Sequence, residues 1–225
     1  FVTAHEVAHQ LWHGLVGSDS RRHPFVDESL AQYSAMVYLE DRYGAARARA
    51  DADTNVKMNY QFMRLLGHPD GAVDRAVGAF GGAVPYAGLV YGKGPYLFAA
   101  LRREVGDAAF FAGVRRYVET YRFATAPPRG IIESIALSAP QRAPQVRALA
   151  RRWLDEAHGD DDLGRADMGA LMGSILGPEA AGAMGPEMNS ALQMLGGMGL
   201  LGGPGGGAGA SGAGAGAGGA LGGVD

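Results

Sequence analysis

The feature that most constrains this chain is a His-Glu-x-x-His pattern close to its first residue. The pattern is formed by His5, Glu6 and His9, and eighteen residues separate His9 from Glu28. Side chains four residues apart on a helix lie one turn apart on the same face, so both imidazoles can reach one metal ion. Apolar positions in residues 1–16 predict that this helix is buried. The spacing therefore predicts a metal site.

Imidazole nitrogens and a carboxylate oxygen are typical zinc ligands, and a catalytic zinc site keeps one position open. Glu28 starts a second helical pattern and is the candidate for the third ligand beside His5 and His9. Glu6 is rotated by about 100° from His5 around the helix, so it lies beside the metal and can take a proton from a zinc-bound water. The alternative is a chance match in which the histidines are ordinary core residues. Buried histidines need partners, and Glu28 supplies one, so the zinc site is favoured.

The sequence around this pattern resembles the zinc-site region of the aminopeptidase N family of zinc metallopeptidases, which belongs to the gluzincins. In that family, HExxH is followed after eighteen residues by a glutamate ligand at the start of the next helix. The resemblance implies one zinc ion per chain, with ligands and general base assigned as follows: His5, His9 and Glu28 bind zinc, and Glu6 is the base. The chain departs from the family at Asp27-Glu28-Ser29, where Asn-Glu-Gly is usual.

A second segment that matches the family is Tyr91-Gly92-Lys93-Gly94. In the family, a Tyr-x-Lys-Gly segment opens a helix, and its tyrosine hydroxyl points at the metal-bound oxygen. The resemblance implies that Tyr91 donates a hydrogen bond to the oxyanion of the tetrahedral intermediate, an interaction worth about 10²–10³ in rate. Tyr86 is a further candidate, for substrate binding. The alternative for Tyr91 is an aromatic side chain that packs at the start of the next helix.

Apolar residues at helical spacing predict a mainly α-helical fold over residues 1–158. The expected helices lie at about 26–43, 45–66, 96–105, 108–121, 131–137 and 145–158. Residues 72–90 are expected to be irregular because they are rich in glycine, and Asp107 is expected to cap the helix that follows it. The resemblance covers roughly residues 1–155 and implies the helical lobe of a thermolysin-like gluzincin catalytic domain, which we expect over 1–158.

The composition changes after residue 158. Glycine, alanine and methionine dominate residues 159–225, and no charged residue lies between Glu187 and Asp225. The richest apolar run, 191–201, is shorter than the ~20 residues that a membrane-spanning helix needs. We therefore expect a low-complexity, disordered tail without chemistry of its own.

Charge and composition limit the partners that the chain can have. The net charge of −3 gives no electrostatic case for nucleic acid, and the absence of cysteine excludes disulfides and thiolate zinc ligands. The chain starts at Phe1 inside the zinc-site region, and family members have upstream a Gly-x-Met-x-Asn strand that binds the substrate backbone. We therefore expect a fragment. A membrane tether would have to come from an upstream region, and these residues assign no compartment.

Together these features predict zinc-dependent hydrolysis of a peptide substrate, with removal of an N-terminal residue as the first expectation. A gluzincin endopeptidase is one alternative, which the upstream strand and an amine-binding glutamate would decide. A catalytically silent, peptidase-like binding module is the other alternative. Such relatives usually lose a ligand, the base or the tyrosine, and this chain retains all of these positions.

Overall fold

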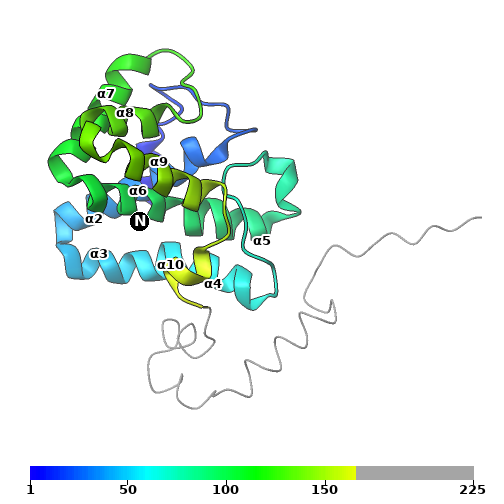
Figure 1. The fold of residues 1–225 in the computed structure, drawn as a ribbon. Coiled ribbons are helices and arrows are strands. Elements are labelled where there is room, and N and C mark those ends of the chain that lie inside the picture. Colours follow the sequence, from blue (N-terminus) through cyan, green and yellow to red (C-terminus); the bar gives the residue numbers. More distant parts are fainter. Residues whose placement is uncertain (166–225) are drawn as a thin grey trace, which may run out of the picture.

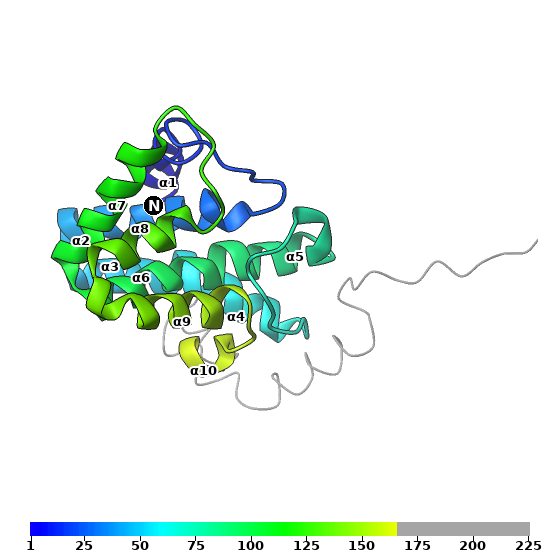
Figure 2. The same cartoon turned by 45° about the horizontal axis from the view of Figure 1, so that its top comes forward.

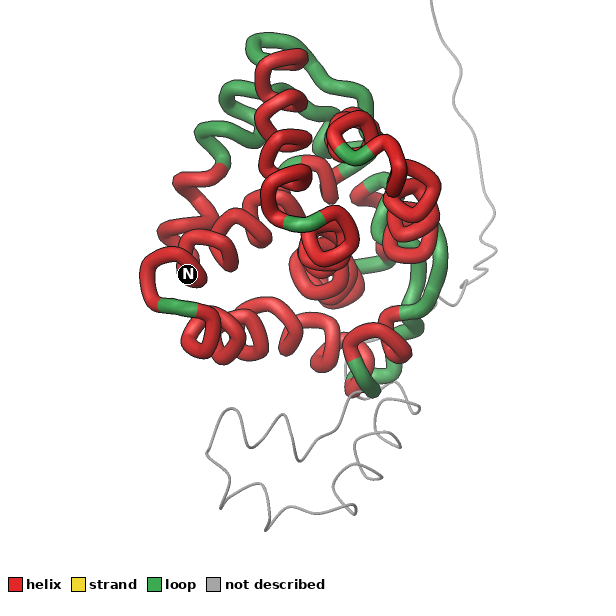
Figure 3. Tube along the Cα trace, turned by 60° about the vertical axis from the view of Figure 1, so that its left-hand side comes forward, coloured by secondary structure: helices red, strands yellow, loops and turns green. Residues whose placement is uncertain are grey.

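The structure, a computed structural model, describes residues 1–165, and this part of the chain is helical. Figure 3 shows helices joined by loops, which confirms the predicted fold class. Within the described residues, strand-like pairing is limited to two isolated bridges, Trp12 with Val16 and Gly17 with Thr125. No helix of this part is both long and apolar enough to cross a membrane. The tail expected over 166–225 lies outside the described residues.

The helices follow one another along most of the described chain (Figure 1). Their bounds are α1 (Val2–Ala8), α2 (Glu28–Tyr43), α3 (Ala45–Ala52), α4 (Met58–Leu65), α5 (Ala83–Tyr86), α6 (Gly94–Val105), α7 (Asp107–Tyr121), α8 (Gly130–Ser138), α9 (Ala143–Leu154) and α10 (Gly159–Leu163). Two π-helical segments join neighbouring helices: η2 (Asp53–Lys57) connects α3 to α4, and η4 (Ala87–Lys93) connects α5 to α6. Short 3₁₀ turns form η1 (Pro24–Val26), η3 (Val77–Phe80) and η5 (Pro140–Arg142).

Helix α6 lies at the centre of the packing, between α2 and α9 (Figure 2). Its apolar side chains Leu97, Phe98 and Leu101 are fully buried. Burial of each such side chain stabilises a fold by about 1.5–3 kcal/mol relative to leaving it exposed. Helix α7 packs on α8, α8 on α9, and α1 on α2. This core fixes the α1–α2 contact that the predicted zinc ligands share.

The first helix is shorter than its apolar pattern predicted. It ends at Ala8, and Val2 and Val7 are 68% and 63% exposed, so the prediction of a buried helix over 1–16 is wrong. The chain leaves the helix because Trp12 folds back into the core, where it is 6% exposed and its indole nitrogen donates to Ser34 at 2.8 Å. Burial of the large Trp12 indole thus outweighs the apolar pattern that predicted a helix through residue 16.

The segment predicted to be irregular, 72–90, is helical in its second half. Helix α5 runs through η4 into α6, so Tyr91 lies inside a long helical stretch and not at a helix start. The glycines of η4 serve close packing on α4. A Cβ on Gly92 would lie 2.5 Å from the backbone nitrogen of Tyr60, and one on Gly88 would lie 2.5 Å from Met63. Glycine content therefore reflects helix contact here, and not irregular backbone.

Other boundaries also differ from the prediction, and α9 ends at Leu154 instead of 158. Helix α2 begins at Glu28 because the residues before it form the 3₁₀ turn η1. Asp107 does not cap α7; it is the first helical residue, and its carboxylate accepts hydrogen bonds from Arg102 at 2.8 and 2.9 Å. The packed part also extends beyond the expected boundary at 158, because α10 follows and its Leu163 joins the core at 8% exposure.

Candidate metal site

The side chains of His5, His9 and Glu28 converge where α1 contacts α2. The Nε2 atoms of the two histidines are 3.1 Å apart, and Glu28 Oε2 lies 3.4 Å from each of them. In a tetrahedral zinc site with bonds of about 2.0–2.1 Å, neighbouring ligand atoms are about 3.4 Å apart. Within residues 1–165, this is the one group of three or more potential ligand side chains close enough to hold a metal ion.

The hydrogen bonding of the cluster also fits a cation. Glu28 Oε2 is buried and makes no hydrogen bond to any residue of the described part. An unpaired buried polar atom costs about 1–3 kcal/mol, and a cation between the three ligand atoms would remove that cost. His9 Nδ1 bonds to the carbonyl of Trp12 at 3.3 Å, so Nε2 is the nitrogen directed at the cluster. The three side chains therefore fit a zinc ion.

The electrostatics of the cluster favour an ionised Glu28. Burial raises the pKa of the carboxyl group, but the neighbouring His5, Tyr91 and His9 side chains outweigh burial, and the pKa lies below its usual range. Metal ligands of this type bind in the deprotonated form. The environment of Glu28 therefore keeps the carboxylate in the state that a cation requires.

Asp27 holds the start of α2 and thus the backbone of Glu28. Its Oδ1 accepts the Glu28 N–H at 2.9 Å, and its Oδ2 accepts the Ser18 hydroxyl at 3.2 Å. His13 Nδ1 lies 3.4 Å from the same Oδ2, and Asp27 itself is 4% exposed. Aspartate is a preferred residue at a helix N-terminus. The departure from the family's Asn at this position therefore keeps a helix-capping side chain.

Glu6 follows His5 on α1, and its side chain is exposed. Its neighbour His5 is 7% exposed and points into the cluster. The carboxylate of Glu6 is thus open to water, one residue after a buried ligand candidate.

Tyr91 lies against the cluster from η4. Its ring centroid is 5.9 Å from that of His5, and the Tyr86 ring packs on it edge to face at 5.6 Å. Burial, together with the charge of Glu28, raises the pKa of the Tyr91 hydroxyl. The hydroxyl therefore stays protonated at neutral pH and can donate a hydrogen bond. The structure thus brings both predicted tyrosines to the metal-ligand cluster.

Sequence reasoning missed a contact that joins α2 to η4. Gly94 N–H bonds to Leu89 O in the π pattern, and the next bond in that pattern would need an N–H that Pro95 lacks. The carbonyl of Val90 is therefore free, and the buried Ser29 hydroxyl donates to it at 2.6 Å. Pro95, five residues after Val90, is the sequence signal that could have indicated this unpaired carbonyl.

Two further contacts join α2 to η4 and the start of α6, one at Gly94 and one at Gln32. A Cβ on Gly94 would lie 2.2 Å from the Ser29 hydroxyl, so only glycine allows this approach. Gln32 Nε2 donates to the Tyr91 carbonyl at 3.4 Å. Helix α2 thus presents Glu28 to the cluster and, one and four residues later, binds the backbone that carries Tyr91.

We expect the Ser29→Ala variant to lower the free energy of unfolding by about 1–3 kcal/mol, because the Val90 carbonyl would be left buried without a donor. Urea unfolding measures the change. Ser134→Ala is the matched control: that hydroxyl is also buried, but it donates to Gly130 O of its own helix, one turn back. An equal loss in both variants would contradict the special role of the Ser29 contact.

The chain matches a known protein family and resembles solved structures. The Peptidase family M1 domain matches residues 1–153. A mutant M1 zinc metallopeptidase from Deinococcus radiodurans, solved with a bound Tyr-Ser-Ala substrate, has a similar fold with a TM-score of 0.52 at 22% identity, over 68% of this chain and 32% of that chain. A second structure of that mutant gives a TM-score of 0.51 at 21% identity, over 67% and 32%. No curated protein matches.

The family match and the similar structures define the fold as that of a peptidase domain. The chain belongs to peptidase family M1. The predicted resemblance to the aminopeptidase N family is thereby confirmed, and the family implies zinc as the metal. The chain spans about a third of the length of the two similar solved structures.

Proposed function

We propose that this chain provides the zinc-binding and catalytic residues for hydrolysis of peptide bonds. The observation that carries the proposal is the convergence of His5, His9 and Glu28 at 3.1–3.4 Å in a chain of the M1 family. These spacings match the edges of a tetrahedral zinc site.

The ligands and the residues near them have different roles in the proposed reaction. His5, His9 and Glu28 hold zinc, which when bound acts as a Lewis acid and makes water a stronger nucleophile. Glu6 accepts a proton from the attacking water and returns it to the leaving amine. Tyr91 donates a hydrogen bond to the oxygen of the substrate carbonyl as negative charge develops there. Tyr86, whose ring packs on Tyr91, contacts the substrate.

Within peptide hydrolysis, we propose the aminopeptidase reaction, which removes the residue at a free N-terminus. The support is the resemblance of both motifs to the aminopeptidase N family. The similar structure from Deinococcus radiodurans holds a Tyr-Ser-Ala substrate, and a short peptide of this kind is the substrate class that we propose here.

Metal removal and a paired substrate panel test this function in the full chain. We expect zinc-loaded protein to hydrolyse aminoacyl anilides with a free amine, dialysis against a chelator to abolish activity, and added zinc to restore it. N-acetylated versions of the same anilides are the matched control and should not be cleaved. Equal cleavage of internal bonds in N-blocked peptides would instead identify an endopeptidase. Bound zinc without turnover of either set would identify a silent binding module.

A further inference from the structure

A fully buried lysine lies two residues after Tyr91. The side chain of Lys93 is 0% exposed, and its amine donates to Asp70 Oδ1 and Oδ2 at 3.1 and 3.2 Å. The same amine donates to the carbonyls of Gly71 at 3.0 Å and Glu156 at 2.8 Å. A lysine almost never becomes fully buried unless it is paired, so these contacts make a specific binding pocket for the amine.

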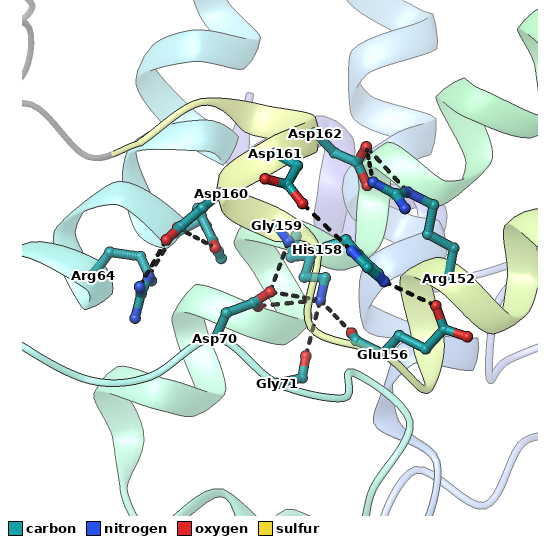
Figure 4. A network of polar contacts seen from close by, with 12 residues as sticks. Arg64, Asp70, Gly71, Arg152, Glu156, His158, Gly159, Asp160, Asp161 and Asp162 are labelled. Carbon is teal, nitrogen blue, oxygen red and sulfur yellow. Dashed lines mark hydrogen bonds and ion pairs between the residues drawn. The ribbon is translucent and has the colours of Figure 1, made fainter.

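The partners of Lys93 come from chain segments far apart in the sequence. Figure 4 shows Asp70, Gly71 and Glu156 in one polar network with residues of α10. Asp70 Oδ2 also accepts the backbone N–H of Gly159 at 2.7 Å. Glu156 and Gly159 lie beyond residue 153, where the family match ends. A segment outside the matched domain therefore binds the lysine through its backbone.

Tyr60 reinforces this contact from α4. Its hydroxyl donates to Asp160 at 2.7 Å, and Arg64 also binds the Asp160 carboxylate, at 2.7 Å. A Cβ on Gly159 would lie 2.5 Å from the Tyr60 ring, and one on Gly92 would lie 2.5 Å from the Tyr60 nitrogen. Tyr60 is therefore packed between α10 and the residue that separates Tyr91 from Lys93. Little free space remains for η4 to shift.

We propose that Lys93 is a positioning residue for Tyr91: its buried pairing with Asp70, covered by residues 156–160, fixes the π-helical turn that directs the Tyr91 hydroxyl. This inference rests on the role of Tyr91 in the proposed function. The Lys93 amine binds Asp70, Gly71 and Glu156, none of which is a candidate metal ligand. It therefore acts on the reaction through backbone geometry alone. A misplacement of about 1 Å in a reacting group can cost on the order of 10²-fold in rate.

A positioning role for Lys93 accounts for a charged pair that is buried at this point of the fold. Burial lowers the pKa of Lys93, and the neighbouring Asp70 opposes that effect. Ion pairs inside proteins contribute little net stability, but they impose a defined geometry because each charge requires its partner. An apolar side chain at position 93 would fill the space without fixing the turn.

A double-mutant cycle in the full, zinc-loaded chain tests the coupling between Lys93 and Tyr91. We expect Lys93→Met to lower kcat by about tenfold or more and to change KM by less than about twofold, because the oxyanion contact forms mainly in the transition state. In a Tyr91→Phe background, the same Lys93→Met change should lower kcat by less than about twofold, since no hydroxyl remains to be misplaced. Zinc content should be unchanged in all variants.

If Lys93→Met lowered kcat by the same factor in the wild-type and Tyr91→Phe backgrounds, the positioning role would be overturned. The proposed function would remain intact. Full activity of Tyr91→Phe alone would reject the catalytic role of Tyr91, and with it this inference. Should Lys93→Met fail to fold, Asp70→Asn gives the same cycle, because it removes the charge that pairs with the Lys93 amine and retains the lysine. Asp161→Asn, whose side chain is 74% exposed on α10, is the matched control and should leave kcat unchanged.

Discussion

Replacement of Glu28 by alanine is expected to remove both zinc binding and peptide hydrolysis from the full chain. Among residues 1–165, Glu28 Oε2 is the one carboxylate oxygen within 3.4 Å of both histidine nitrogens, so the variant retains two ligands of three. A catalytic zinc site needs three protein ligands, and two imidazoles alone bind the metal far more weakly. Metal analysis after dialysis, with hydrolysis rates on the same samples, measures both losses.

Glu40→Ala is the matched control for this variant, because Glu40 lies on the same helix and pairs with Arg102, away from the metal ligands. It should keep zinc and activity. Asp27 still caps α2 in the Glu28 variant, so its circular dichroism spectrum should be unchanged. Retention of a full zinc equivalent by Glu28→Ala would show that the third ligand has been assigned to the wrong residue.

Replacement of Glu6 by glutamine is expected to lower the hydrolysis rate by about 10²–10⁴-fold, the usual contribution of a general base. Glutamine has the size of glutamate but cannot accept the proton. Zinc content should remain at the wild-type level, because the ligands His5, His9 and Glu28 are untouched. The expected separation of binding from catalysis distinguishes this variant from Glu28→Ala.

Steady-state kinetics and metal analysis on one preparation check the Glu6 prediction. Glu119→Gln, an exposed carboxylate on α7, removes the same charge away from the cluster and should leave the rate unchanged. A Glu6→Gln enzyme with kcat near the wild-type value would mean that another group accepts the proton.

The convergence of His5, His9 and Glu28 could be predicted from the sequence because it depends on local geometry. His5 and His9 share a helix face whatever the surrounding fold, and Glu28 starts the helix that contacts it. The resemblance added Tyr91, and the structure places its ring beside His5. Helices α2, α6 and α7 also lie close to where the apolar pattern predicted them.

Tertiary packing determines the end of α1 and the helical conformation of η4, which the apolar pattern of the sequence did not predict. The chain leaves α1 after Ala8 because Trp12 is buried elsewhere, and no local signal marks that break. The glycines on both sides of Tyr91 indicated a loop, yet Gly88 and Gly92 allow η4 to lie against α4. Close backbone approach and flexible turns favour the same residue, so composition could not distinguish them.

Polar contacts over long sequence distances were also beyond prediction. Ser29 binds the Val90 carbonyl, and Lys93 binds Asp70 and Glu156. A lysine within the apolar run around Tyr91 was a signal of a buried ion pair, but the sequence alone could not name its partner. The residues that hold the site in place were therefore harder to find than the residues of the site.

The most direct test of the zinc site is anomalous X-ray diffraction at the zinc edge from crystals of the full chain. We predict one anomalous peak between His5 Nε2, His9 Nε2 and Glu28 Oε2, at about 2.0–2.2 Å from each atom. A zinc-supplemented crystal with no peak at these side chains, or with the metal held by other residues, would contradict the assignment of this site.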